Sequence, residues 1–124
     1  MKFDETIPIY LQIKEEIVNA IISGALQEDE VIPSIRVLAQ QYRLNPQTVS
    51  NAVSELLNEG FLYKKRGIGM FVQKDSKKKL KKQRSEEFRQ KDFRKAIEKG
   101  HYLGIERKDL INIIDSIYKQ EDRS

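Results

Sequence analysis

Apolar residues recur at helical spacing near the start of the chain. They predict a helix from Pro8 to about Ser23, which Gly24 can end in a left-handed conformation. The inward side chains of this helix are expected to be Tyr10, Ile13, Ile17, Ala20 and Ile21. A loop over residues 25–33 follows, and its expected core anchors are Leu26, Val31 and Ile32.

Two more amphipathic stretches follow this loop, and each has a marked start. Ser34 is suited to cap a short helix that reaches Tyr42. Asn45 and Pro46 suit the N-cap and the first position of the next helix, which ends at Gly60. The expected inward positions are Ile35, Leu38, Ala39 and Tyr42 in the shorter helix, and Val49, Ala52, Val53, Leu56 and Leu57 in the longer one. Because the two helices are joined by only three residues, they predict a helix-turn-helix.

A β-hairpin is predicted directly after these helices. The stretch FLYKKRGIGMFVQK, residues 61–74, holds two strand-like runs separated by the tip residues 66–69. The apolar positions that alternate with polar ones are Phe61 and Tyr63 on the first run and Met70 and Val72 on the second. A hairpin in this position is the wing of a winged helix. Its cations Lys64, Lys65 and Arg66 stand beside glycines, so side chain and backbone can both approach phosphate.

The composition changes after residue 73. Residues 77–99 are predicted to be a highly charged helix, residues 100–104 to break it, and a second helix to follow. The apolar positions expected to form an interface are Phe88, Phe93, Ile97, Leu110, Ile113, Ile114, Ile117 and Tyr118. Two short helices cannot bury such faces by themselves, which favours a symmetric dimer; packing against the same chain's first domain is the alternative. We therefore expect a first domain over residues 1–75 and a dimerisation region over residues 76–124.

Composition adds limits to this picture. The chain has 124 residues, 39% of them hydrophobic and 34% charged, which suits one small domain with an appendage. It contains no cysteine, so it has neither disulfides nor a thiolate metal site. No stretch approaches the roughly 20 apolar residues that cross a membrane. The first ten residues also lack the apolar run of a signal peptide. A cytoplasmic location is therefore expected.

The net charge of +4 is unevenly distributed. Residues 1–30 carry a net charge of −5, residues 31–73 carry +3, residues 74–95 carry +7, and the remainder carry −1. A local excess of this size fits a polyanionic partner. The run KKKLKKQR, residues 77–84, either contacts DNA or forms a solvated helix, and the sequence leaves both possibilities open.

The polar face of the third helix is short and neutral. It consists of Gln47, Ser50, Asn51, Ser54 and Asn58, whereas solvated helix faces are usually rich in lysine and glutamate. Amide groups on a narrow helix match the donor and acceptor pattern of base edges in the DNA major groove. An ordinary surface is the alternative interpretation of this face.

The residues from Pro8 to Val72 resemble the DNA-binding domain of GntR-family transcriptional regulators. The resemblance is carried by PIYLQIKEEIVNAIISGAL, IPSIRVLAQQYRLNPQTVSNAVSELLNEGFL and RGIGMFV, in the family's order and spacing. The short two-helix tail and the Asn-Pro pair are similar to the YtrA subfamily. Many members of the family carry arginine where this chain has Pro46 and Ser50, so a guanine contact from those positions is not expected here.

This resemblance implies roles for individual residues. Arg36 is expected to contact phosphate or a base, and Arg66 and Gly67 to form a wing tip that approaches the minor groove. The DNA-facing start of the third helix is expected to comprise Asn45, Gln47, Thr48 and Ser50, to which the polar-face argument adds Asn51. The wing cations Lys64 and Lys65 complete the candidate DNA-binding set.

The expected fold is mainly helical with a small β-hairpin: a winged helix-turn-helix followed by a two-helix tail. The expected function is a homodimeric transcriptional repressor that binds an inverted-repeat operator, with a transporter operon as a possible target suggested by YtrA-like members. A winged helix that binds protein instead of DNA is the alternative. The single histidine, His101, has no cysteine or second imidazole to act with, so neither an enzyme nor a metal or cofactor is expected.

Overall fold

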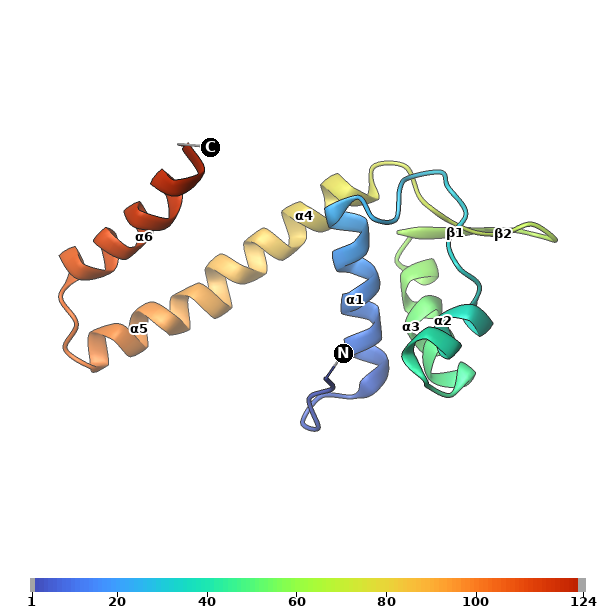
Figure 1. Cartoon of the computed structure of the whole chain (residues 1–124), viewed down its shortest axis with the longest axis horizontal. Coiled ribbons are helices and arrows are strands. Elements are labelled where there is room, and N and C mark those ends of the chain that lie inside the picture. Colours follow the sequence, from blue (N-terminus) through green and yellow to red (C-terminus); the bar gives the residue numbers. More distant parts are fainter. Residues whose placement is uncertain (1, 123–124) are drawn as a thin grey trace. The chain divides into compact units, whose positions relative to one another are not determined.

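The computed structural model describes residues 2–122, with side chains for residues 2–119. The described chain divides after Lys82 into two compact units. The first contains α1 (Ile9–Ser23), α2 (Ile35–Tyr42), α3 (Pro46–Asn58), β1 (Leu62–Lys65), β2 (Gly69–Val72) and the start of α4 (Ser76–Glu87). The second contains the end of α4, a π-helical segment η1 (Phe88–Phe93), α5 (Arg94–Tyr102) and α6 (Arg107–Asp122). Figure 1 shows this order, and the predicted fold, mainly helical with one antiparallel hairpin, is confirmed.

The helix starts that the sequence predicts are present as side-chain caps. Ser34 Oγ accepts a hydrogen bond from the backbone N–H of Val37 at 3.2 Å, and Asn45 Oδ1 accepts one from that of Gln47 at 2.8 Å. Each satisfies a donor that has no partner within its own helix. Gly24 follows α1 with φ of 87°, the left-handed conformation expected of a glycine after a helix. These local signals fix where α2 and α3 begin, and hence which side chains α3 exposes.

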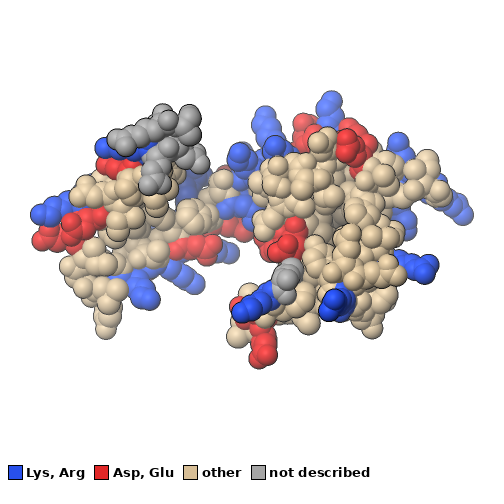
Figure 2. All heavy atoms as spheres, in the orientation of Figure 1, with Lys and Arg blue, Asp and Glu red and all other residues tan. Residues whose placement is uncertain are grey.

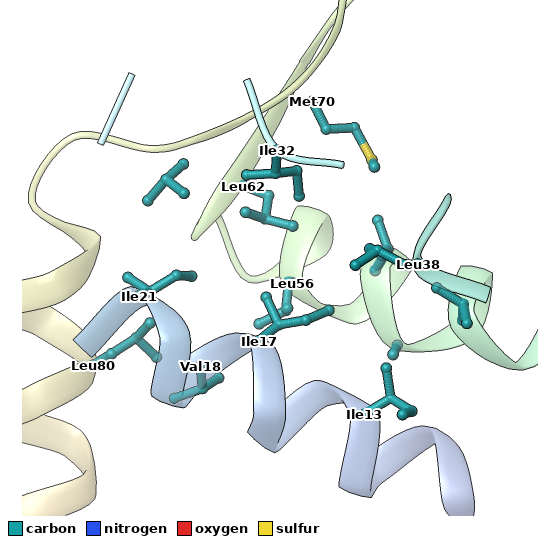
Figure 3. Packing of buried hydrophobic residues seen from close by; sticks show 14 of the residues in the cluster. Ile13, Ile17, Val18, Ile21, Ile32, Leu38, Leu56, Leu62, Met70 and Leu80 are labelled. Atoms are coloured by element: carbon teal, nitrogen blue, oxygen red, sulfur yellow. The ribbon is translucent and has the colours of Figure 1, made fainter. Parts of the chain in front are cut away.

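Helices α1, α2 and α3 and the hairpin enclose one apolar core. Figure 3 shows side chains from these elements meeting there, and Leu80 of α4 pointing toward Val18 and Ile21 of α1. Leu80 is fully buried, as are Ile13 of α1 and Leu56 of α3. The core therefore extends into the first turns of α4. There Ser76 Oγ also donates to the backbone carbonyl of Phe61 at 2.9 Å. The predicted domain boundary at residue 75 stays a prediction.

The loop before α2 pairs with the wing instead of remaining free. The N–H of Asp29 donates to the carbonyl of Val72, and that of Ile32 to the carbonyl of Met70, both at 2.8 Å. Ile32 is buried as expected, but Val31 is 59% exposed, so its prediction as a core anchor is wrong. The reason is strand alternation: neighbouring residues of an extended segment point to opposite faces.

Leu62 is the residue of β1 that lies in the core. Leu62 pairs with Val72, Tyr63 with Phe71 and Lys65 with Gly69. Leu62, Met70 and Val72 are buried on one face, whereas Tyr63 lies on the other and is only partly buried. Of the apolar positions noted in the sequence, Met70 and Val72 therefore face the core, whereas Tyr63 lies opposite Phe71 on the other face.

The second unit keeps Gly100 inside a helix. The prediction that the break begins at this residue is wrong, because α5 continues to Tyr102 and the turn follows it. Gly100 is buried, and a Cβ built there would lie 3.3 Å from Leu110 Cδ1. A side chain at this position would therefore meet Leu110 in a tight contact, so the glycine suits the close packing of α6 on α5 and not a turn. None of the described helices is long and apolar enough to cross a membrane.

Candidate nucleic-acid interface

The first turns of α3 expose two amide side chains that are bonded to each other. Gln47 and Asn51 stand four residues apart, and Gln47 Nε2 donates to Asn51 Oδ1 at 3.0 Å. Both side chains are exposed, while Thr48 and Ser50 are half-buried beside them. The pair leaves Gln47 Oε1 free of this bond as an acceptor and Asn51 Nδ2 as a donor. The helix thereby presents a donor and an acceptor side by side.

Two exposed arginines stand near the amide pair in the sequence. Arg36 lies in the first turn of α2, as predicted, and its side chain is exposed. Arg43 forms the C-cap of α2 in a left-handed conformation, with φ of 56°, and is also exposed. The sequence interpretation did not select Arg43, although its place in the three-residue turn before Asn45 would have indicated it. Both guanidinium groups can contact phosphate.

The wing tip is a narrow turn with a cation at its apex. The N–H of Ile68 donates to the carbonyl of Lys65 at 3.0 Å, which closes the turn around Arg66 and Gly67. Gly67 has φ of 78°, a conformation that residues with a side chain rarely adopt. Arg66 is exposed at this tip. In Figure 1 the hairpin projects beyond the three helices, and Figure 2 shows lysine and arginine side chains at that end.

Lys64 and Lys65 lie on opposite faces of the wing. Lys65 Nζ stands 4.9 Å from the ring centroid of Phe71, and this ring stacks on Tyr63 with centroids 5.4 Å apart. Tyr63 donates to Asp29 Oδ1 at 3.0 Å, and burial, followed by the Asp29 carboxylate, raises the pKa of Tyr63. Lys64 instead lines a groove with the start of α2. On one face of the wing Lys65 therefore lies over aromatic rings, whereas on the other face Lys64 is directed toward the start of α2.

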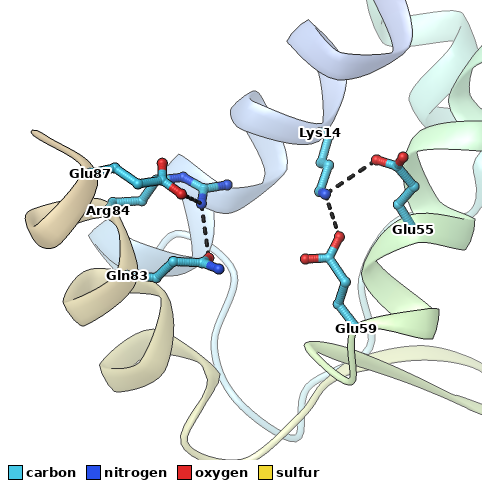
Figure 4. A network of polar contacts seen from close by, with 6 residues as sticks. All are labelled: Lys14, Glu55, Glu59, Gln83, Arg84 and Glu87. Atoms are coloured by element: carbon cyan, nitrogen blue, oxygen red, sulfur yellow. Dashed lines mark hydrogen bonds and ion pairs between the residues drawn. The ribbon is translucent and has the colours of Figure 1, made fainter. Parts of the chain in front are cut away.

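Acidic side chains of α3 are confined to its last turns. Lys14 of α1 bonds to Glu59 and lies 3.2 Å from Glu55 (Figure 4). The partial burial of Lys14 acts to lower its pKa, but the two carboxylates outweigh this effect and raise it. Glu55 follows Gln47 by eight residues, about 12 Å along the helix axis. The start of α3 is thus kept free of negative charge, as a DNA-facing surface requires.

The tail carries an apolar groove between α5 and α6. A volume of about 330 Å³ is lined by Phe93, Ile97, His101, Ile105, Arg107, Leu110, Ile111 and Ile114. Seven of the eight predicted interface residues are exposed large apolar side chains, among them Ile113, Ile117 and Tyr118, and Leu110 is half-buried. Phe88 and Phe93 contact each other across η1, with ring centroids 5.7 Å apart. The second unit on its own leaves this surface uncovered.

A polar amide face on the second helix of a helix-turn-helix, with a basic wing beside it, defines a DNA-binding winged helix-turn-helix protein. Comparison with known proteins identifies its family. Residues 9–72 match the model of bacterial regulatory proteins of the gntR family, so the chain belongs to this family. It is accordingly a DNA-binding transcriptional regulator and not an enzyme.

Individual relatives agree with this assignment. The HTH-type transcriptional repressor YtrA of Bacillus subtilis is 31% identical over 89% of this chain and 84% of its own length. The arabinose metabolism transcriptional repressor of Geobacillus stearothermophilus is 45% identical over 60% of this chain, and that match spans only 21% of the repressor. The similarity to this longer repressor therefore covers only about a fifth of its length.

Solved structures give the same picture. A GntR family transcriptional regulator from Listeria monocytogenes superposes with a TM-score of 0.77 and 27% identity, over 92% of this chain and 98% of that one. The AraR DNA-binding domain in complex with operator ORR3 superposes with a TM-score of 0.53 and 35% identity, over 58% of this chain and 87% of that one. The first covers the tail helices as well as the winged helix, and the second shows a homologous domain bound to operator DNA.

Proposed function

We propose that this protein is a repressor that binds an inverted-repeat operator as a homodimer. The observation that carries the proposal is the exposed Gln47–Asn51 amide pair at the start of α3, in a domain that also exposes cations on the wing and on α2. Repression is supported by YtrA, which is similar over most of its length and is itself named a repressor. The site of action is the cytoplasm, where the DNA of bacteria lies.

Base recognition and phosphate contact fall to different residues. The amide pair at the start of α3 offers an acceptor and a donor, which match the N6 amino group and the N7 atom of adenine in the major groove. The exposed Arg36, Lys64 and Arg66 supply positive charge and position the helix through contacts with phosphates. Asn45, which caps α3, and Thr48 and Ser50, which are half-buried, stand at the edge of this surface.

Dimerisation falls to the second unit. Its exposed apolar surface includes Ile97, Ile113 and Ile117, and aliphatic side chains of this kind gain about 1.5–3 kcal/mol each when they are buried. A second copy of the chain supplies the same surface, so a two-fold axis can cover both at once. The two DNA-binding domains of such a dimer then contact two half-sites. Binding both half-sites increases the discrimination against competing genomic sequences. The target that we propose is a transporter operon, as suggested by the similarity to YtrA-like regulators.

Selection of double-stranded DNA from a random pool by the full-length chain tests the proposal. We expect an enriched consensus with two inverted half-sites, retained by a species that sediments as a dimer. Enrichment without a consensus, or a consensus with a single half-site bound by a monomer, would contradict the proposal. Capture of DNA from genomic fragments by the same preparation then identifies candidate operators and the genes that follow them.

A further inference from the structure

An aliphatic side chain stands at the tip of the wing, among the cations. Ile68 is 68% exposed, more than Ile7 or Val37 in the same unit. Its neighbours along the chain are Gly67 and Gly69, both with positive φ (78° and 144°), so no side chain flanks it. The isoleucine contributes little to the core and makes the narrow tip apolar.

Ile68 shares a groove with the start of α2. This groove of about 390 Å³ is lined by Ile68, Lys64, Met70 and four further residues of the loop and of α2, together with Gly69. Arg36 follows in the first turn of α2. Lys65, in contrast, lies over the rings of the opposite face. Ile68 is therefore part of the wing surface that carries Lys64.

The dimensions of DNA decide which groove this tip can enter. An α-helix with its side chains is about 10–12 Å across and fills a major groove about 12 Å wide. An element beside α3 must then pass over the sugar–phosphate backbone toward the next minor groove, which is about 6 Å wide. The tip is narrow enough to enter it, because its turn consists only of Arg66 and Gly67 and because glycines flank Ile68 on both sides. Arg66 would contact the phosphates or the groove edge on the way.

We propose that Ile68 enters the minor groove beside each half-site and selects A·T pairs there. This inference rests on the proposed binding of α3 to the major groove. The minor-groove edge of a G·C pair carries the guanine N2 amino group, which A·T pairs lack. That group occupies the space that the methyl groups of Ile68 need. An aliphatic side chain also cannot accept its hydrogen bond, so the donor would be buried without a partner.

The test uses the selected operator and the full-length chain. The A·T pairs under the wing, located by footprinting, are replaced by G·C and, in a second duplex, by inosine·C. Inosine·C has the major-groove edge of G·C but no N2 amino group. We expect G·C to weaken binding about tenfold, within the range usual for one mismatched pair, and inosine·C to restore it to within about twofold. Ile68→Ala should bind all three duplexes with similar affinity.

Two controls show whether Ile68 itself provides the discrimination. Ile7→Ala removes an exposed isoleucine that lies beside Glu15 and Glu16, and it should keep the full discrimination. Ile68→Ala should leave the salt dependence of binding unchanged, because an aliphatic side chain releases no counterion. If the wild-type chain binds G·C and inosine·C duplexes equally, or if Ile68→Ala still distinguishes them, the inference is wrong. A chain that selects no operator at all would instead contradict the proposed function.

Discussion

Gln47 and Asn51 form a single hydrogen-bonding unit on the exposed face of α3, because Gln47 Nε2 donates to Asn51 Oδ1 at 3.0 Å. Each amide fixes the orientation of the other before DNA arrives. A side chain already held in one rotamer loses less conformational entropy on binding than a free one. The pair therefore predicts coupled behaviour in mutants, which two independent surface amides would not show.

Gln47→Ala should relax the base preference at one step of each half-site by about 1–3 kcal/mol, the usual value of a bidentate contact. Asn51→Ala should have a similar effect, and the double variant should lose less than the sum of the two because the residues act together. Competition binding against single-base operator variants measures these differences. Ser54→Ala, a change at an exposed position farther along the same helix, is the matched control. Strict additivity would contradict the coupled unit.

Removal of wing cations should change the salt dependence of binding unequally. Arg66 is exposed at the tip, so Arg66→Ala should weaken binding to most sequences alike and reduce the slope of log affinity against log salt by about 0.9. Lys65 is held 4.9 Å from the Phe71 ring centroid, on the face opposite Lys64, so Lys65→Ala should change the slope less. Affinity titrations from low to moderate salt provide the comparison. Equal slopes for both variants would contradict the assignment of faces.

The sequence predicted those parts of the fold that depend on local chemistry. Caps such as Ser34 and Asn45 act within one helical turn, so their effect can be inferred from a few residues. The errors concern contacts between distant segments. Gly100 looks like a helix break until Leu110 is known to pack against it, and Val31 looks like a core residue until its pairing with Phe71 turns it outward.

For the candidate site too, the sequence predicted the features that depend on local pattern and missed those that depend on the three-dimensional structure. The residue types of the polar face on α3 indicated an interaction with bases, and their placement on one side followed from helical periodicity. The bond between Gln47 and Asn51 depends on side-chain rotamers, which a pattern does not specify. Lys64 and Lys65 lie on opposite faces because neighbouring strand residues alternate. Which of the two faces the start of α2 depends on the register of the hairpin, which is set by its turn and by the buried Leu62.

Leu80 makes α4 a part of the winged-helix unit. Its side chain is fully buried against that core, so Leu80→Ala should lower the free energy of unfolding by about 2–5 kcal/mol. Lys78→Ala, an exposed change on the same helix, should have little effect. Urea unfolding of both full-length variants measures the difference.

By the same argument, a chain ended after residue 82 should be more stable than one ended after residue 73. Equal stability of the two truncated chains would show that α4 adds nothing to the core.

The contacts of Lys14 with Glu55 and Glu59 predict a pH dependence at the alkaline end. The pKa of Lys14 is raised in the folded protein above its ordinary value of 10.5. The stabilisation is therefore complete below pH 10.5 and is lost as the pH rises through the higher folded-state value. Lys14→Met should lower the free energy of unfolding by about 1 kcal/mol at pH 7 and by less above pH 10.5. Thermal unfolding of the wild-type chain and of Lys14→Met at several pH values measures the difference in their stability. A difference that grows as the pH rises would contradict the prediction.

The apolar surface of the tail predicts that one charge can abolish both dimerisation and tight operator binding. Ile114 lines the groove between α5 and α6 and is 37% exposed in the single chain. In a dimer, Ile114→Asp would bury an unpaired carboxylate, a change that is strongly destabilising. Asn112→Asp adds the same charge to an exposed position on the polar side of α6, so it should leave the dimer intact.

Sedimentation at micromolar concentration distinguishes the two variants. The Ile114 variant should sediment as a monomer with weak, salt-sensitive binding to a two-half-site operator. A wild-type chain that is monomeric under these conditions and still binds the operator fully would contradict the role of the tail.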